Sequence, residues 1–179
     1  MAFADYLDLR TAVIEQVGDA SVVDVFDRLT KLAEVYLTRN LRMSQQLSET
    51  DLVVSGGVAS LPDDFAETFG VYDRNGYEIN QQTLQDLQGD TSRDGTYTLQ
   101  YYAKIPTLTG APTNSNWLLE AHPDVYLYSV AYEAAKHLRD TESAQAFMAL
   151  REDAVFDARG SDHRTRYSRT RVRVKGCTP

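Results

Sequence analysis

Hydrophobic residues in this chain of 179 residues recur at helical spacing near both ends and alternate like strand residues in between. Tyr6, Leu9, Val13 and Val17 stand three or four positions apart, just ahead of Gly18. This spacing predicts an amphipathic helix over 6–17. The glycine predicts the end of that helix, because glycine enters the left-handed conformation of a C-cap without strain.

A second and longer apolar stripe runs from Val22 to about Leu41. Ser21 and Asp24 resemble a capping box with a shorter acid, so we expect the helix to start there. A helix over this stretch would be roughly 30 Å long.

The pattern changes to that of strands over residues 46–102, which we interpret as a small β-rich insertion. Gly56-Gly57 and Asn75-Gly76 each separate two short apolar runs, as in hairpins. Asn-Gly is the preferred pair for a type I′ turn. We also expect one helical turn over 83–87, a loop over 89–95 and a strand over 96–102.

Two further helices are predicted after a loop over 104–122. Pro123 suits the first position of a helix, and Asp124 suits its positive N-terminal end. Asp140 or Thr141 can cap a last helix, which we expect Gly160 to end. The predicted fold class is therefore α+β. It comprises an antiparallel bundle of about four helices from 1–45 and 103–160, the insertion at 46–102, and an extended basic tail at 161–179.

Charge is divided unevenly along the chain. Residues 1–158 carry 11 basic and 25 acidic side chains, a net charge of −14, whereas residues 159–179 carry a net charge of +6. The acidic body would repel the phosphate backbone of nucleic acid. Surfaces of opposite sign also suit association between copies or with a partner.

The basic tail alternates basic residues with Thr and Val, so an extended chain would show one cationic and one β-branched face. A charge run is usually a solvated segment. It could also bind nucleic acid, although Tyr167 is its one aromatic residue for base stacking. The alternation favours a third interpretation, strand addition to a partner's sheet with arginines paired to acids. The predicted docking residues are Arg164, Arg166, Tyr167, Arg169, Arg171, Val172, Arg173, Val174 and Lys175.

Several of the eleven tyrosines gather near the single tryptophan along the sequence. They suit either a half-buried edge of the core or a subunit interface, where Tyr and Trp are enriched. The sequence favours neither interpretation over the other. The candidate interface residues are Tyr101, Tyr102, Trp117, Tyr126, Tyr128 and Tyr132.

Catalytic chemistry finds little support in the sequence. The three histidines, His122, His137 and His163, lack the spacing of metal ligands. The acidic pairs are adjacent in sequence, whereas productive acid–base pairs normally converge from separate elements. We therefore predict no enzymatic activity, no catalytic residue, no metal and no cofactor. We also expect no membrane partner, because no run approaches the roughly 20 apolar residues of a membrane span.

Several short motifs occur in a distinctive order. They are Thr38–Arg42, Leu61–Phe65, Leu99–Pro106, Thr113–Leu119, and His122–Tyr128 with Glu133-Ala134-Ala135. In this order they resemble the motifs of head-to-tail adaptor (connector) proteins of tailed bacteriophages, over most of residues 5–160. The segment Gly89–Gly95 is shorter than the hairpin that such proteins usually carry before the Tyr-Tyr strand.

The resemblance implies a structural protein of the virion neck, at the portal vertex, made in the host cytoplasm. It implies a homo-oligomeric ring, in this family usually twelvefold, beneath the portal protein. Duplex DNA would pass through the ring without specific binding, a tail or nozzle protein would dock on it, and the basic tail would reach the portal. The alternative from the residues alone is a small nucleic-acid-binding protein that uses the basic tail.

Overall fold

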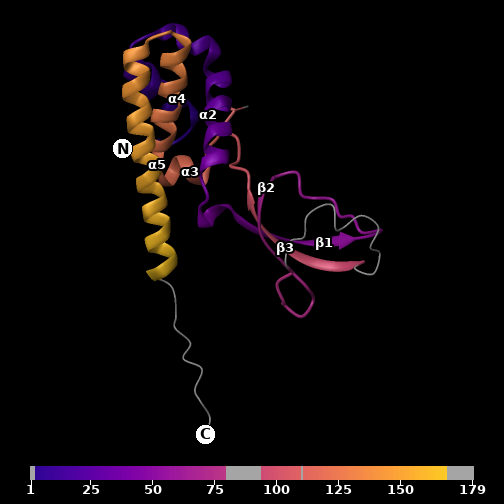
Figure 1. Ribbon diagram of the computed structural model, residues 1–179. Helices are drawn as coiled ribbons and strands as arrows, with labels where there is room; N and C mark the ends of the chain where they lie inside the picture. Colours follow the sequence, from indigo (N-terminus) through magenta and orange to yellow (C-terminus); the bar gives the residue numbers. More distant parts are fainter. Residues whose placement is uncertain (1–2, 80–93, 110, 169–179) are drawn as a thin grey trace. The chain divides into compact units, whose positions relative to one another are not determined.

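The computed structural model describes residues 3–79, 94–109 and 111–168 (Figure 1). Internal contacts divide the chain into two compact units. We call residues 1–33 with 109–179 the helical unit, and residues 34–108 the sheet unit.

The first helix, α1, comprises Tyr6–Val17, as its apolar spacing predicts. Asp5 caps it, because its carboxylate accepts hydrogen bonds from the backbone N–H groups of Leu7 and Asp8. Gly18 ends it with a φ of 75°, and its N–H donates to the carbonyl of Ile14 at 2.8 Å. The predicted helix and its glycine cap are confirmed.

The expected long helix from Ser21 is divided in two. Ala20–Val25 form a 3₁₀ helix, η1, and α2 comprises Phe26–Asn40. Asp19 rather than Ser21 is the cap, because its carboxylate accepts a hydrogen bond from the Ser21 N–H at 2.8 Å. The predicted start and length were therefore wrong, since the 15 residues of α2 rise only about 22 Å.

The predicted loop over 104–122 contains a short helix, α3, over Trp117–Ala121. Helix α4 follows over Pro123–His137 and has Pro123 in its first turn, as predicted. Helix α5 comprises Thr141–Ser168. Asp140 caps it by accepting a hydrogen bond from the Ser143 N–H at 3.1 Å, which confirms one of the two predicted caps.

Helix α5 does not end at Gly160 but continues for eight residues. A glycine inside a helix costs only about 1 kcal/mol relative to alanine, and Arg166 pairs with the buried Asp162 at 2.8 Å beyond it. The extended tail therefore cannot begin at residue 161, because residues 161–168 are helical. The predicted tail residues 169–179 lie outside the described residues.

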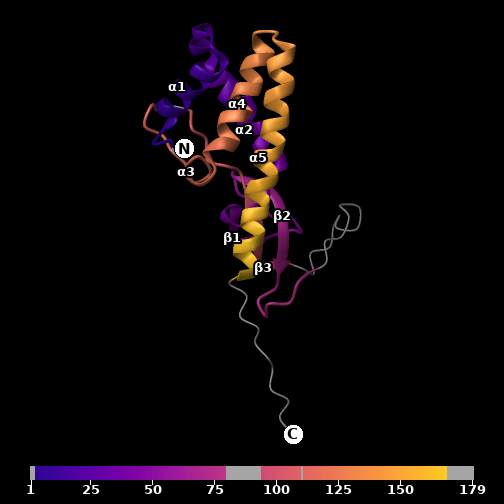
Figure 2. The same ribbon diagram turned by 90° about the vertical axis from the view of Figure 1, so that its left-hand side faces the viewer.

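Helix α4 lies between α1 and α5 in the helical unit (Figure 2). Its alanines 131, 134 and 135 are buried and let neighbouring helices approach closely. Helix α1 adds Leu9 and Val13 to this core, and α5 adds Phe147, Ala154 and Ala158. The antiparallel four-helix arrangement stays a prediction.

Among its described residues, the sheet unit contains three antiparallel strands in the order β1-β3-β2. They are β1 (Leu47–Val54), β2 (Phe65–Tyr72) and β3 (Gly95–Ala103). Strand β3 confirms the predicted strand over 96–102, and the sheet with its helices confirms the α+β class.

The first predicted hairpin is wrong beyond its turn. Gly56 and Gly57 form a tight turn with positive φ, but the bridge between Ser55 and Val58 is isolated. Strand β1 pairs instead along its whole length with β3, from Leu47 opposite Tyr102 to Val54 opposite Gly95. The distant strand offers a longer ladder than residues 58–61 do.

The second predicted turn exists with a different geometry. Gly76 has a φ of 80°, whereas Asn75 is not among the non-glycine residues with positive φ, so the turn is not of type I′. The Asp73 carboxylate accepts hydrogen bonds from the N–H groups of Asn75 and Tyr77 at 2.8 and 2.9 Å. The predicted helical turn at 83–87 lies outside the described residues.

Two buried polar side chains make hydrogen bonds where the chain enters and leaves the sheet. The Glu34 carboxylate accepts hydrogen bonds from the Leu108 N–H at 2.7 Å and the Thr107 hydroxyl at 2.8 Å. The Gln46 side chain accepts from the Met43 N–H and donates to the Ala103 carbonyl. These bonds hold together the segments that enter and leave the sheet.

Candidate interaction surfaces

Tyr101 and Tyr102 are adjacent on β3 and therefore face opposite sides of the sheet. Tyr101 is buried, its ring stacks on Phe65 at 5.9 Å, and its hydroxyl donates to Asp64 at 3.0 Å. Burial, followed by the bond to Asp64, raises the pKa of Tyr101. This ring belongs to the core of the sheet unit.

Tyr102 is half-buried on the other face of the sheet. The Arg42 guanidinium lies 5.8 Å from the centre of its ring, and Phe69 meets the ring edge-on at 5.9 Å. Arg42 also pairs with Glu67 at 2.5 Å. Since Phe69 is 49% exposed, this cluster offers aromatic and charged groups at one surface.

Tyr126 is fully buried in α4. Its hydroxyl accepts a hydrogen bond from the Asn116 side-chain amide at 2.8 Å. Asn116 also caps α3, because its side-chain oxygen accepts from the Leu119 N–H at 2.9 Å. Tyr126 thus fixes the start of α3 against α4 inside the unit.

Tyr132 lies between two cations on the surface of α4. The Arg151 guanidinium is 4.2 Å and the Lys136 ammonium 4.9 Å from the centre of its ring. Arg151 is buried in α5, whereas Lys136 is exposed and pairs with Glu133 at 3.0 Å. The ring therefore joins α4 to α5. Trp117 and Tyr128 are also half-buried in the helical unit.

The six candidate interface residues do not form one group. Two belong to the sheet unit and four to the helical unit. Burial assigns Tyr101 and Tyr126 to the core of their own units. The interface prediction now concerns the half-buried rings of Tyr102, Trp117, Tyr128 and Tyr132, and it stays a prediction.

The basic residues that precede residue 169 stand on the last turns of α5. Arg159, His163 and Arg164 are exposed there, and Arg166 is partly exposed. Helix α5 has 28 residues and its antiparallel neighbour α4 has 15. The end of α5 therefore projects about 20 Å past α4 (Figure 1). Tyr167 lies on this helix, and Arg169 to Lys175 lie outside the described residues.

Sequence reasoning missed the exposed phenyl ring of Phe156. This side chain of α5 is 74% exposed, and Leu150 on the same helix is 40% exposed. A helical projection finds Phe156, because it stands opposite the buried line of Phe147, Ala154 and Ala158.

Comparison with protein families matches residues 4–175 to the family of the SU10 adaptor protein. The match covers nearly the whole chain, both units included. The chain belongs to the SU10 adaptor protein family. No curated protein matches it.

As an SU10 adaptor protein, the chain is a phage structural adaptor that interacts with other capsid or tail proteins in the virion. This confirms the motif resemblance at the level of phage adaptors.

The described part of this SU10 adaptor protein holds no group of three or more His, Cys, Asp or Glu side chains that could bind a metal ion. Across the same residues, no helix is both long enough and apolar enough to cross a membrane.

Proposed function

We propose that this chain is the head-to-tail adaptor of a phage neck. Copies form a ring, usually twelvefold in such proteins, beneath the portal protein. The ring extends the channel for duplex DNA and presents a docking surface to a tail or nozzle protein. The role is mechanical rather than enzymatic.

One observation carries this proposal: the basic end of α5 projects past the rest of the helical unit. Arg159, His163 and Arg164 are exposed on it. The alternating segment from Arg169 to Lys175 continues directly from this end. A sequence in which basic and β-branched residues alternate suits docking on an acidic groove or a free sheet edge of another protein. We assign Arg164, Arg166, Tyr167, Arg169, Arg171, Val172, Arg173, Val174 and Lys175 to portal docking.

The acidic remainder of the chain supports a channel role. A net charge of −14 over residues 1–158 repels the phosphate backbone, so DNA would slide past the ring rather than bind it. Contacts between copies would use half-buried rings such as Tyr102, Trp117, Tyr128 and Tyr132, because such rings add contact area at low entropic cost.

Truncation after Ser168 tests the docking role, because it keeps all the described residues. We expect the truncated chain to retain its helical circular dichroism and to lose binding to purified portal rings of the same phage. Reversing charge at Arg171 and Arg173 to Glu should reproduce the loss. Replacing Val172 and Val174 with Thr is the matched control, because it keeps the charge and the β-branching. Portal binding by the truncated chain at full strength would contradict the proposal.

The same proteins test the nucleic-acid alternative, which the exposed Arg159 and Arg164 favour. That alternative predicts affinity for duplex DNA that falls steeply with salt, with a slope of about 0.9 per phosphate contacted. The adaptor role predicts no measurable binding to duplex DNA at physiological salt.

A further inference from the structure

Phe156 projects from the outer face of α5 with little around it. One helical turn before it stand Glu152 and Asp153, both exposed, and one turn after it stands Gly160. A side chain added at Gly160 would meet no atom within 4 Å. A single exposed apolar residue is common on protein surfaces. The exposure of Phe156 therefore indicates an interface only if another surface of the chain can receive its ring.

The helical unit has such a feature at the start of α1. A cavity of about 240 Å³ opens there, lined by Tyr6, Leu7, Arg10, Asp27, Ala111 and Pro112. An enclosed cavity of about 150 Å³ accepts benzene, so this one can admit a phenyl ring. Leu7, which is 42% exposed, Ala111 and Pro112 give it an apolar wall.

Hydrogen bonds fix the walls of this cavity. The Leu7 N–H donates to the Pro112 carbonyl at 3.1 Å, and the Tyr6 N–H donates to the Asn114 carbonyl at 2.9 Å. The Tyr6 hydroxyl donates a hydrogen bond to the Asp27 carboxylate. These bonds hold the walls of the cavity in place within one copy.

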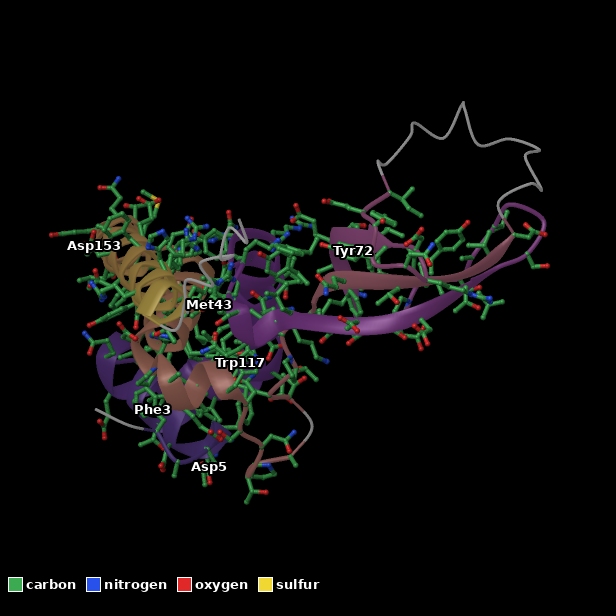
Figure 3. All side chains as sticks on the ribbon, turned by 90° about the horizontal axis from the view of Figure 1, so that it is seen from below. Phe3, Asp5, Met43, Tyr72, Trp117 and Asp153 are labelled. Carbon is green, nitrogen blue, oxygen red and sulfur yellow. The ribbon has the colours of Figure 1, made fainter. Side chains whose placement is uncertain are left out.

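Phe156 and the cavity lie on opposite sides of one unit. Helix α4 separates α1 from α5 (Figure 2). Viewed from below, Asp153 of α5 and Asp5 at the start of α1 lie at opposite edges of the helical unit (Figure 3). A protruding group on one side and a matching cavity on the other allow identical copies to associate head to tail and close into a ring.

The two features also stand at the same level along the helices. Ala111 and Pro112, which line the cavity, are followed along the chain by α3 and the start of α4. Since α4 and α5 are antiparallel across the turn at 138–140, the start of α4 lies opposite about residue 155 of α5. Two copies side by side with parallel axes would therefore bring Phe156 to the height of the cavity.

Arg10 at the cavity is opposite in charge to Glu152 and Asp153 beside Phe156, and the acidic Asp27 in the cavity wall accepts a hydrogen bond from the Tyr6 hydroxyl. Arg10 lies one turn along α1 from Tyr6, in the direction in which α1 rises beside α4 (Figure 2). Glu152 and Asp153 lie one turn from Phe156 toward the same end of the unit, where α5 begins. Within the part of the chain that the structure describes, none of these three charges has a hydrogen bond or ion pair.

We infer that Phe156 of one copy inserts into the cavity at Tyr6, Leu7 and Pro112 of the next copy. Arg10 of that next copy pairs with Glu152 and Asp153 beside the inserted ring. This contact deepens the proposed function, because it names the surface on which the ring of adaptors closes.

Cross-linking tests the contact. A chain with Cys177→Ser, Thr11→Cys and Ala149→Cys places one thiol near the cavity and one near Phe156, both at exposed positions. A short bis-maleimide should give a ladder of multimers, both for the concentrated free protein and for protein bound to portal rings. Chains with a single cysteine should give no more than dimers.

Two sets of variants give the contact its sharpest test. Phe156→Asp should lower the cross-linked fraction about 30-fold, as expected for an anchor residue. Arg10→Glu and Asp153→Lys should each lower it, and the two together on one chain should restore it. A mixture of Phe156→Asp chains with Leu7→Asp chains should stop at heterodimers, because just one intact contact can form. Circular dichroism checks that each variant folds.

The outcomes separate this contact from the proposed function. Portal binding without a ladder, or a ladder insensitive to Phe156→Asp and to the charge exchange, overturns the contact and leaves the adaptor role standing. A charge-dependent ladder without any portal binding supports the contact and contradicts the docking role. Neither portal binding nor cross-linking at any concentration overturns both.

Discussion

The helical unit and the sheet unit differ in which apolar side chains they leave exposed. Leu9 and Val13 of the helical unit are fully buried, and so are Leu37 and Leu108 of the sheet unit. In the part that the structure describes, the sheet unit has β1 and β2 on either side of β3, and it leaves Val53 and Val58 about 70% exposed. Both units therefore bury a core, but they differ in what they leave exposed: the helical unit exposes the ring of Phe156 and a basic helix end, and the sheet unit exposes β-branched residues of a strand and a turn.

The largest effect should come from the core of the helical unit. Leu9→Ala removes a side chain with 0% exposure, and it should lower the free energy of unfolding by about 2–5 kcal/mol. Urea unfolding followed by the fluorescence of Trp117, the single tryptophan, measures this loss. The control Leu32→Ala, at a site 49% exposed, should cost less than about 1 kcal/mol. Equal losses of unfolding free energy at Leu9 and Leu32 would contradict the role of burial.

The hydrogen bond between Asn116 and Tyr126 should give the next largest effect. Asn116→Ala removes the cap of α3 and a buried partner of the tyrosine hydroxyl. We expect a loss of about 1–3 kcal/mol. In a double-mutant cycle with Tyr126→Phe, the combined loss should be smaller than the sum of the two single losses. Strict additivity would contradict a direct coupling.

Gly18 of the helical unit and Gly76 of the sheet unit have nearly the same backbone conformation, so the same substitution can be compared between the two units. Gly18 and Gly76 have φ of 75° and 80°, and a Cβ at either would meet no atom within 4 Å. Alanine should therefore cost about 1–2 kcal/mol at each site, through the left-handed conformation alone. Amide hydrogen exchange should show Gly76→Ala loosening β2 and β3, and Gly18→Ala loosening α1. Exchange that rises equally in both units for either variant would show that the units unfold together.

The periodic pattern was sufficient for the helices whose apolar residues face a core. Helices α1 and α4 follow their sequence signals closely, because burial of one face and a local cap determine them. The end of α5 could not be read from Gly160, since buried Asp162 and its pairing with Arg166 extend the helix. Sequence reasoning also missed the cavity at Tyr6, because its walls come from segments a hundred residues apart.

The positions of the strands could be predicted from the sequence more readily than the pairing between them. The strand over 96–102 was predicted, but its role between β1 and β2 depends on contacts distant in sequence. The turn at Asn75-Gly76 likewise takes its geometry from the Asp73 carboxylate rather than from the dipeptide alone. The strand order depends on pairing between residues distant in sequence, and the turn geometry depends on hydrogen bonds from the backbone to a side chain.

The smallest predicted effect is a pH dependence of the turns in the sheet unit. Backbone N–H groups hold the pKa of Asp73 and Asp94 below their ordinary values, chiefly that of Tyr77 for Asp73 and that of Gly57 for Asp94. Because these pKa values are lower in the folded chain, their stabilisation is present above the unfolded value of about 4. It is lost as the pH falls through the folded pKa. The protection of the amides at the two turns, relative to the intrinsic exchange rate at each pH, should therefore fall below about pH 4. Asp73→Asn and Asp94→Asn should each flatten that dependence, and an unchanged profile would contradict the assignment.

An image of the virion neck at side-chain resolution tests the central claim most directly. The account predicts copies of this chain in a closed ring beneath the portal, with helical units side by side and residues from Arg169 onward against the portal. It also predicts Phe156 of each copy in the cavity at Tyr6 and Leu7 of its neighbour. A neck that lacks this chain, or a ring whose basic ends grip the DNA instead of the portal, would contradict the account.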